Sequence, residues 1–232
     1  MCFVNILDLF FPRICFGCGH IGKYFCRKCS LQIRYFSPQI CPVCTRPAFD
    51  GVTHDFCRSR YTLDGLTSIF RYEGIIKIGV KKIKYKWAYD ICREIISLLP
   101  PNLELPINRY SDTNHILIPV PLHPKRLRWR GFNQAEILGK IIAENTGWQI
   151  KKDIIIRGKE TKNQADLKRN ERLKNMIGAF SINPKYKSAD LRETNFIVFD
   201  DVWTTGATLR NCSNVLKRFG AGKVWGLTLA HG

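Results

Sequence analysis

The stretch from residue 195 to residue 209 constrains the fold more than any other part of the chain. It reads NFIVFDDVWTTGATL and opens with the apolar run Phe196–Phe199. Four β-branched or aromatic residues in a row are too few for a helix and indicate a buried strand. The run ends at Asp200 and Asp201, and small turn residues and a helical pattern that closes at Gly220 follow. The sequence therefore predicts a strand, a loop and a helix start, with two carboxylates where the strand ends.

This arrangement suits a sugar phosphate. In open α/β sheets, ligands bind at the carboxyl ends of parallel strands, where these carboxylates would accept hydrogen bonds from sugar hydroxyls. The hydroxyl and N–H groups of the turn precede a helix, and a helix N-terminus favours a phosphate group. The residues expected to hold the phosphate are Thr204, Thr205, Gly206, Ala207 and Thr208. The alternative is an ordinary strand and capped helix that carry two aspartates without a ligand.

The same stretch resembles the phosphoribosyl-diphosphate (PRPP) signature of the type I phosphoribosyltransferases. In that signature an apolar strand, two acidic residues, two spacers and a turn of Thr, Ser, Gly or Ala follow one another. The resemblance implies an α/β fold with an open, mainly parallel sheet flanked by helices. It also implies PRPP and Mg²⁺ as ligands, with Asp200 and Asp201 as catalytic residues that orient the ribose.

Composition limits the class of protein. The chain has 232 residues, 45% hydrophobic and 24% charged, which is enough for one α/β core and a small additional module. The formal charge of +18 favours polyanionic ligands. The first apolar stretch, residues 3–12, is interrupted by Asn5 and Asp8 and has no basic leader, which indicates neither a signal peptide nor a membrane span. Ten cysteines without a secretory signal indicate metal ligation and a cytoplasmic protein.

Residues 1–63 are predicted to form a cysteine-rich zinc-ribbon module. The x-x spacing within each pair lets two side chains take adjacent corners of a tetrahedron, and two pairs close a structural Zn²⁺ site. If consecutive pairs share a metal ion, the four pairs give two sites. A cross-braced arrangement of the pairs is equally compatible with the spacing. His54 is the least certain ligand, because an exposed histidine near a turn is the alternative. The candidate ligands are Cys15, Cys18, Cys26, Cys29, Cys41, Cys44, His54 and Cys57.

Residues 64–115 are predicted to form a basic bridge. Its pattern indicates a strand at 66–72, helices at 73–85 and 88–99, and a linker at 100–114. Lysines interleaved with aromatic residues suit single-stranded nucleic acid, because cations contact the backbone and rings stack on bases. The same sequence pattern is equally compatible with a solvated helix face whose aromatic residues are buried. The candidates in this segment are Lys81, Lys82, Lys84, Lys86 and Trp87.

Residues 116–232 are predicted to form the main α/β domain. A strand at 116–120 leads into a basic loop, a helix at 133–145 and a strand at 149–157. The loop would lie beside the aspartates, where Arg126, Arg128 and Arg130 would bind diphosphate oxygens. Trp129 between two arginines would alternatively stack on a base of a single strand.

A highly charged segment follows the strand at 149–157 and is predicted to be a flexible loop. Arg157 and Arg172 would reach the leaving diphosphate from this segment, although a solvated helix and turn is the alternative reading. A last strand is expected at 223–230. Type I enzymes cover the acceptor with a hood, and the segment left to supply it here is residues 1–100.

Several motifs occur together in one order: the cysteine pairs, RGFNQA at 130–135, R-x3-T-x2-Q-x2-L at 157–167, N-x2-GAF at 175–180, and FDDVWTTGAT. Together they resemble the ComF family. That resemblance implies a double zinc ribbon before a phosphoribosyltransferase domain, and a role in natural transformation with single-stranded DNA and DNA-uptake helicase or competence proteins as partners. The first hypothesis is a protein that binds PRPP with Mg²⁺ and single-stranded DNA. The alternative is an active phosphoribosyltransferase that makes a nucleotide from an unidentified base or amine.

Overall fold

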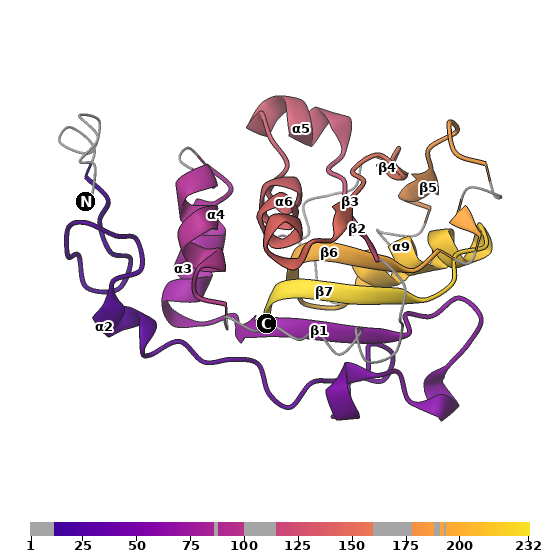
Figure 1. The fold of residues 1–232 in the computed structure, drawn as a ribbon, viewed down its shortest axis with the longest axis horizontal. Coiled ribbons are helices and arrows are strands. Elements are labelled where there is room, and N and C mark those ends of the chain that lie inside the picture. The colour runs from indigo at the N-terminus through magenta and orange to yellow at the C-terminus, as the bar shows by residue number, and fades with distance from the viewer. Residues whose placement is uncertain (1–11, 86–87, 100–114, 160–177, 188–190, 193) are drawn as a thin grey trace.

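The computed structural model describes residues 12–85, 88–99, 115–159, 178–187, 191–192 and 194–232 (Figure 1). Three predicted segments lie largely or wholly outside these residues. They are the first apolar stretch at residues 3–12, the linker at 100–114 and most of the charged loop after residue 159.

A five-stranded parallel sheet forms the centre of the molecule, in the order β1-β7-β6-β2-β3. The strands β4 and β5 pair with each other in a separate antiparallel ribbon. The predicted α/β class with an open, mainly parallel sheet is confirmed. The strands are β1 (Gly65–Arg71), β2 (Ile116–Pro119), β3 (Gln149–Ile150), β4 (Ile155–Arg157), β5 (Phe180–Ile182), β6 (Phe196–Trp203) and β7 (Val224–His231).

Side chains of the central strands alternate between two apolar cores. On β6, Ile197 and Phe199 pack into one core with α3, α4 and α6, whereas Phe196 and Val198 pack into the other with α9. A sheet covered on both faces needs apolar residues at every position, which explains the uninterrupted run Phe196–Phe199. The helices are α2 (Arg27–Ser30), α3 (Gly74–Lys82), α4 (Ala88–Ile96), α5 (Pro124–Arg130), α6 (Gln134–Thr146) and α9 (Ala207–Arg218).

Three element boundaries differ from the sequence-based prediction. The strand predicted at 149–157 is two short strands in different sheets, because the chain leaves the main sheet after Ile150. The strand predicted to end at the aspartates continues to Trp203, since β7 pairs with it as far as His231. The basic loop before Gly131 is the helix α5.

The cysteine module runs along the exposed edge of β1 (Figure 1). The amide of Gln39 donates to the Ser68 carbonyl at 3.0 Å and accepts from the Ser68 N–H at 2.9 Å, so it pairs with the strand edge as a neighbouring strand would. At the other end of the module, Phe25 packs against Gly79 of α3 and donates its N–H to Glu94 of α4 at 3.1 Å. Short 3₁₀ turns, η1 (Phe49–Gly51) and η2 (Asp55–Cys57), complete the module.

The proposed division at residues 63 and 115 stays a prediction. The predicted bridge supplies β1, α3 and α4, and β1 is a full member of the main sheet through its pairing with β7. Among the helices of the described residues, none is both long enough and apolar enough for a bilayer crossing.

Candidate functional site

The acidic pair lies at a cavity of about 360 Å³ near the carboxyl ends of β2, β4 and β6. Asp200 and Asp201 both line it, and the Asp201 N–H donates to Asp200 Oδ1 at 2.9 Å. This is the position in which open parallel sheets bind ligands. The structure therefore brings the predicted carboxylates to a cavity large enough for a small ligand.

Asp201 is held by side chains from two other parts of the chain. Lys84, which follows α3, places its Nζ 3.6 Å from Asp201 Oδ2. Gln134 at the start of α6 donates from Nε2 to the same oxygen at 3.4 Å and accepts from Arg130 Nη1 at 2.5 Å. Lys84 was predicted to contact nucleic acid, which stays a prediction, and the structure places it beside Asp201.

The helix α5 determines which of the candidate arginines line the cavity. Pro124 begins the helix, the His123 ring accepts the Lys125 N–H at 3.3 Å, and Gly131 ends it with a left-handed φ of 84°. Residues four apart share a helix face, so Arg126 and Arg130 both line the cavity. Arg128 is exposed on another face and is not among the lining residues.

A third arginine enters the cavity from β4. Arg157 is 7% exposed, and its guanidinium lies 5.5 Å from the centre of the Phe180 ring. Burial and the nearby Arg126 lower the pKa of both Arg130 and Arg157. The Nε of Arg130 is buried and has no hydrogen-bond partner among the described residues. Crowded guanidinium groups in a partly dry cavity favour an anion, because its charge relieves their mutual repulsion.

The turn after β6 is shaped by Trp203. Gly206 has a left-handed φ of 74°, and a Cβ on it would lie 2.3 Å from the Trp203 ring, so only glycine fits. Thr208 lines the cavity, whereas Thr205 is buried and its hydroxyl accepts the Ala207 N–H at 3.4 Å. Of the five turn residues predicted to hold phosphate, the structure thus places Thr208 on the cavity wall.

The surroundings of Asp200 disfavour the ionised form of its carboxyl group. Burial and the adjacent Asp201 carboxylate raise its pKa well above the usual range. A raised folded-state pKa contributes stability that is complete below the unfolded pKa and is lost as pH rises through the folded pKa. At neutral pH, which lies above the unfolded pKa, Asp200 therefore lowers the stability of the fold, as is typical of a residue placed for function.

We expect Asp200→Asn to be more stable than the parent at pH 7, because the amide removes a carboxyl group that ionises less readily in the folded than in the unfolded chain. The melting temperature should rise by about 2–4 °C for each kcal/mol regained, and the difference should shrink as the parent is acidified. Thermal unfolding at several pH values measures this, with the exposed Glu144→Gln as the control. A variant that melts below the parent at pH 7 contradicts the prediction.

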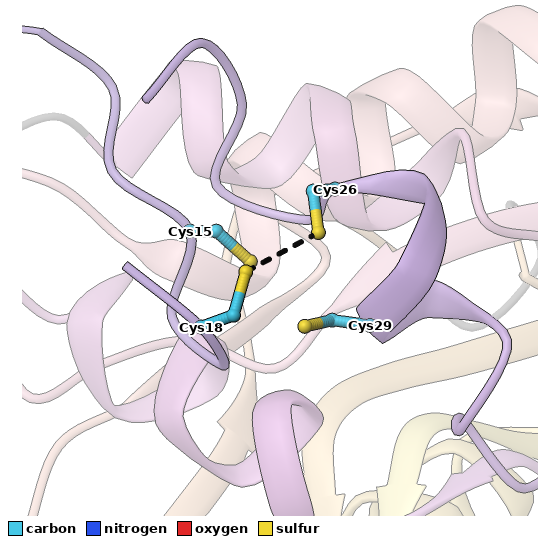
Figure 2. Close-up of side chains that lie close together, drawn as sticks. All are labelled: Cys15, Cys18, Cys26 and Cys29. Carbon is cyan, nitrogen blue, oxygen red and sulfur yellow. Dashed lines mark hydrogen bonds between the residues drawn. The ribbon is translucent and has the colours of Figure 1, made fainter. Parts of the chain in front are cut away.

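The eight cysteine and histidine candidates form two separate clusters. Within each, the ligand atoms all lie within 4.8 Å of one another. Figure 2 shows Cys15, Cys18, Cys26 and Cys29 converging, with 3.6 Å between the sulfurs of Cys18 and Cys26. Sulfurs at ~2.3 Å from one Zn²⁺ would be about 3.8 Å apart in a tetrahedron. The first cluster thus fits a structural zinc ion, and sequential pairing replaces the cross-braced alternative.

The second cluster joins Cys41, Cys44, His54 and Cys57. His54 Nδ1 lies 3.4 Å from Cys44 Sγ, while its Nε2 lies 3.1 Å from the Pro47 carbonyl. A carbonyl partner keeps the proton on Nε2 and leaves Nδ1 to bind metal, which is the usual arrangement around a zinc-binding histidine. His54 therefore fits the fourth corner, and the two clusters fit two zinc ions.

Backbone N–H groups assist the first cysteine of each cluster. Burial opposes ionisation of Cys15, but hydrogen bonds from the backbone of Cys26 and Cys18 outweigh it and lower its pKa to about 6. Burial likewise opposes ionisation of Cys41, and the backbone of Cys44 lowers its pKa. Thiolates stabilised by the backbone are ready to bind metal.

Arg210 connects the second cluster to the turn at the cavity. Its Nε donates to the Pro42 carbonyl at 2.6 Å and its Nη2 to the Val43 carbonyl at 3.1 Å, inside the loop between two ligands. The guanidinium also lies 5.5 Å from the Trp203 ring centre, and Trp203 supports Gly206. The second metal loop and the turn after β6 thus share one arginine.

We expect Arg210→Ala to lower the free energy of unfolding by about 2–3 kcal/mol, since it removes two charge-assisted hydrogen bonds. Zinc should also pass faster to a chromogenic chelator, because the second loop loses its support. Chemical unfolding and zinc-release kinetics measure both effects. The exposed Arg218→Ala on the same helix is the matched control, and equal behaviour of the two variants contradicts the prediction.

The nucleic-acid candidates are dispersed. Trp129 lines the cavity and is 77% exposed, Lys82 lines a neighbouring cavity, and Lys81 is exposed and lines neither. Lys86, Trp87 and the diphosphate candidate Arg172 lie outside the described residues.

Sequence reasoning missed Gln134 and Arg210 as parts of the site. Gln134 stands in the motif RGFNQA, which was quoted without a role for this residue. Tyr85 and Lys84 line the cavity, as the hood expected from residues 1–100 requires. No sequence signal identifies Arg210, because its partners lie 167 and 168 positions away.

Comparison with known proteins agrees with this architecture. Residues 6–59 match the double zinc ribbon domain. Competence protein F of Haemophilus influenzae is 27% identical over 94% of this chain and 90% of its own length. Competence protein ComFC of Bacillus subtilis is 28% identical over 82% of this chain and 77% of its own length. The chain is similar to ComF proteins along most of its length. A further ComF-like relative, DNA utilization protein YhgH of Escherichia coli O157:H7, is 27% identical over 92% of this chain and 94% of its own length.

The similarity to ComF proteins agrees with the two parts of the structure. A zinc-ribbon module lies beside a phosphoribosyltransferase-like α/β fold in one chain. The predicted resemblance to the ComF family is thereby confirmed, and the metal clusters and the acidic cavity are the two candidate sites of this chain.

Proposed function

We propose that this ComF-like protein binds PRPP together with Mg²⁺ in the cavity at the end of β6. One observation carries the proposal: two adjacent carboxylates share a cavity with three guanidinium groups and with Thr208 in the first turn of α9. The carboxylates suit ribose hydroxyls and the metal, since Mg²⁺ prefers oxygen ligands. The arginines suit the diphosphate, and the helix start suits the 5-phosphate.

Each group of the ligand then has partners in this chain. Asp200 and Asp201 would hold the ribose and Mg²⁺, with Lys84 moving away from Asp201 as the ligand enters. Gln134 would keep Asp201 in place, because it bonds both that carboxylate and Arg130. Mg²⁺ supplies charge neutralisation of the diphosphate when it is bound.

Titration calorimetry on the zinc-loaded protein tests the proposal. We expect saturable PRPP binding with a Kd between about 1 µM and 1 mM that weakens when Mg²⁺ is omitted. Ribose 5-phosphate and inorganic diphosphate, which each lack half of the ligand, should bind more weakly. Binding of PRPP no tighter than of diphosphate alone contradicts the proposal. Release of diphosphate in the presence of an added acceptor would identify an active transferase.

Single-stranded DNA is the second candidate ligand. The formal charge of +18 and the exposed Trp129 between Arg128 and Arg130 favour it, because rings stack on bases and cations contact phosphates. The names of the relatives point the same way, since they describe competence proteins and DNA utilization proteins.

We expect Trp129→Ala to weaken binding of a thymidine oligonucleotide by about tenfold, the effect of losing one stacked base. The affinity of the parent should fall steeply with salt, with a logarithmic slope of about −0.7 for each phosphate contacted. Fluorescence anisotropy measures both, and Leu127→Ala, an exposed residue of the same helix, is the control. Affinity independent of salt would contradict the nucleic-acid candidate.

A further inference from the structure

A second cavity opens beside the first. Its volume is about 900 Å³, and it shares Lys84, Tyr85, Trp129 and Arg130 with the cavity of the acidic pair. An occupant of this second cavity, called here the ribbon chamber, would therefore lie next to whatever the aspartates hold.

The ribbon chamber has aromatic walls from two parts of the chain. The first zinc loop supplies Phe16 and Tyr24, whose rings stack with centroids 5.2 Å apart and an interplanar angle of 21°. The Phe16 N–H donates to the Tyr24 carbonyl at 3.0 Å, so the metal loop holds both rings. Trp129 and Tyr85 also line the chamber and are 77% and 65% exposed. Exposed aromatic side chains of this kind favour a flat aromatic ring that stacks on them.

Every ionisable lining group that bears a charge at neutral pH is a cation. They are Lys82, Lys84 and Arg130, and none of the described residues that line the chamber is an aspartate or glutamate. The buried Nε of Arg130 has no hydrogen-bond partner among the described residues. Lys84 is paired with Asp201, but no ion pair joins Lys82 or Arg130 to an acidic group of the described residues. A ring that carries a carboxylate would pair with these two cations, and a neutral ring would not.

We propose that the ribbon chamber binds a small planar heteroaromatic carboxylate as the second ligand of this protein. Two of its cations, Lys84 and Arg130, also line the acidic cavity, which sets the negative group of the ring on the side that faces the sugar phosphate. A nucleic-acid strand would instead need a row of cations that continues beyond the cavity. That such a ligand is a partner of PRPP rests on the proposed function, but its binding does not.

Ligand-observed NMR and calorimetry on the zinc-loaded full-length protein, without PRPP, test this site. The probes are matched pairs that differ in charge: nicotinate with nicotinamide, orotate with uracil, and indole-2-carboxylate with its amide. We expect at least one acid to bind with a Kd below about 1 mM and about tenfold more tightly than its uncharged partner. Failure of every acid, or equal affinity for acid and uncharged partner, overturns the proposal.

Variants separate the chamber from the acidic cavity. Lys82 lines the chamber alone, so Lys82→Ala should weaken the acid by about tenfold and leave PRPP affinity unchanged. Lys77→Ala, an exposed lysine on the same helix, is the matched control. Replacing both aspartates by asparagine should abolish PRPP binding and retain the acid, so the two proposals fail independently. If Lys82→Ala acts only on oligonucleotide binding, the chamber is a nucleic-acid site and the proposal is wrong.

Discussion

Replacing both acidic residues, Asp200→Asn with Asp201→Asn, is expected to weaken binding of PRPP with Mg²⁺ by at least about 100-fold. Each carboxylate would lose charge-assisted bonds of about 1.5–3 kcal/mol, and the amides are poor ligands for Mg²⁺. Because Asp200 and Asp201 are adjacent on β6 and line the same cavity, neither can take over the role of both.

Inorganic diphosphate provides the internal control for this experiment. The double variant keeps Arg126, Arg130 and Arg157 and loses two negative charges, so diphosphate should bind at least as tightly as to the parent. The exposed Glu144→Gln controls for a carboxylate-to-amide change elsewhere. Calorimetry measures all three proteins. PRPP affinity that is unchanged in the double variant would falsify the assignment of the acidic pair.

Removing one ligand of the first zinc centre, Cys29→Ala, is expected to unfold the amino-terminal end of the cysteine module. Structural zinc ions contribute about 10–16 kcal/mol of apparent binding energy to small domains, and that energy is folding energy. The bound zinc should fall by one ion per chain. The contacts of Phe25 with Gly79 and Glu94 should be lost with the fold of this segment.

Metal analysis, circular dichroism and limited proteolysis measure this outcome. We expect new cleavage near residues 15–29 while the parallel sheet stays resistant, because the sheet has its own cores on both faces. Cys92→Ala is the matched control, since Cys92 is fully buried on α4 and belongs to neither cluster. Full zinc content and unchanged cleavage in Cys29→Ala would show that the cluster is not a zinc site.

The sequence predicted which residues lie together where these residues are close along the chain. The aspartates and the turn after β6 are consecutive in sequence, so a strand-turn-helix pattern suffices to place them. The pairs Cys15–Cys18 and Cys26–Cys29 are likewise close in sequence. Their spacing predicted that both cysteines of a pair bind the same metal ion. The choice between sequential and cross-braced pairing was left open, because spacing within a pair carries no information on which pairs meet.

Errors arose where local patterns were ambiguous. The segment before Gly131 was read as a loop, although Pro124 at a helix start and glycine at its end are helix signals. That helix decides which arginines face the cavity, and a loop would not have separated Arg128 from its neighbours. The contact of Lys84 with Asp201 was not predicted, because it spans 117 positions of the sequence and has no local signature.

The sequence by itself determined the strand, the acidic pair, the turn, the cysteine pairs and the resemblance to the ComF family, because each depends on residues that are close together along the chain. The tertiary structure alone decided which pairs share a metal, which arginines enter the cavity, and that Lys84 meets Asp201. It alone also placed the aromatic residues of the zinc loop in a chamber that shares lining residues with the acidic cavity. The physical reason is that these contacts join distant segments, and their geometry is set by how the module packs on the sheet and not by any local preference of the backbone.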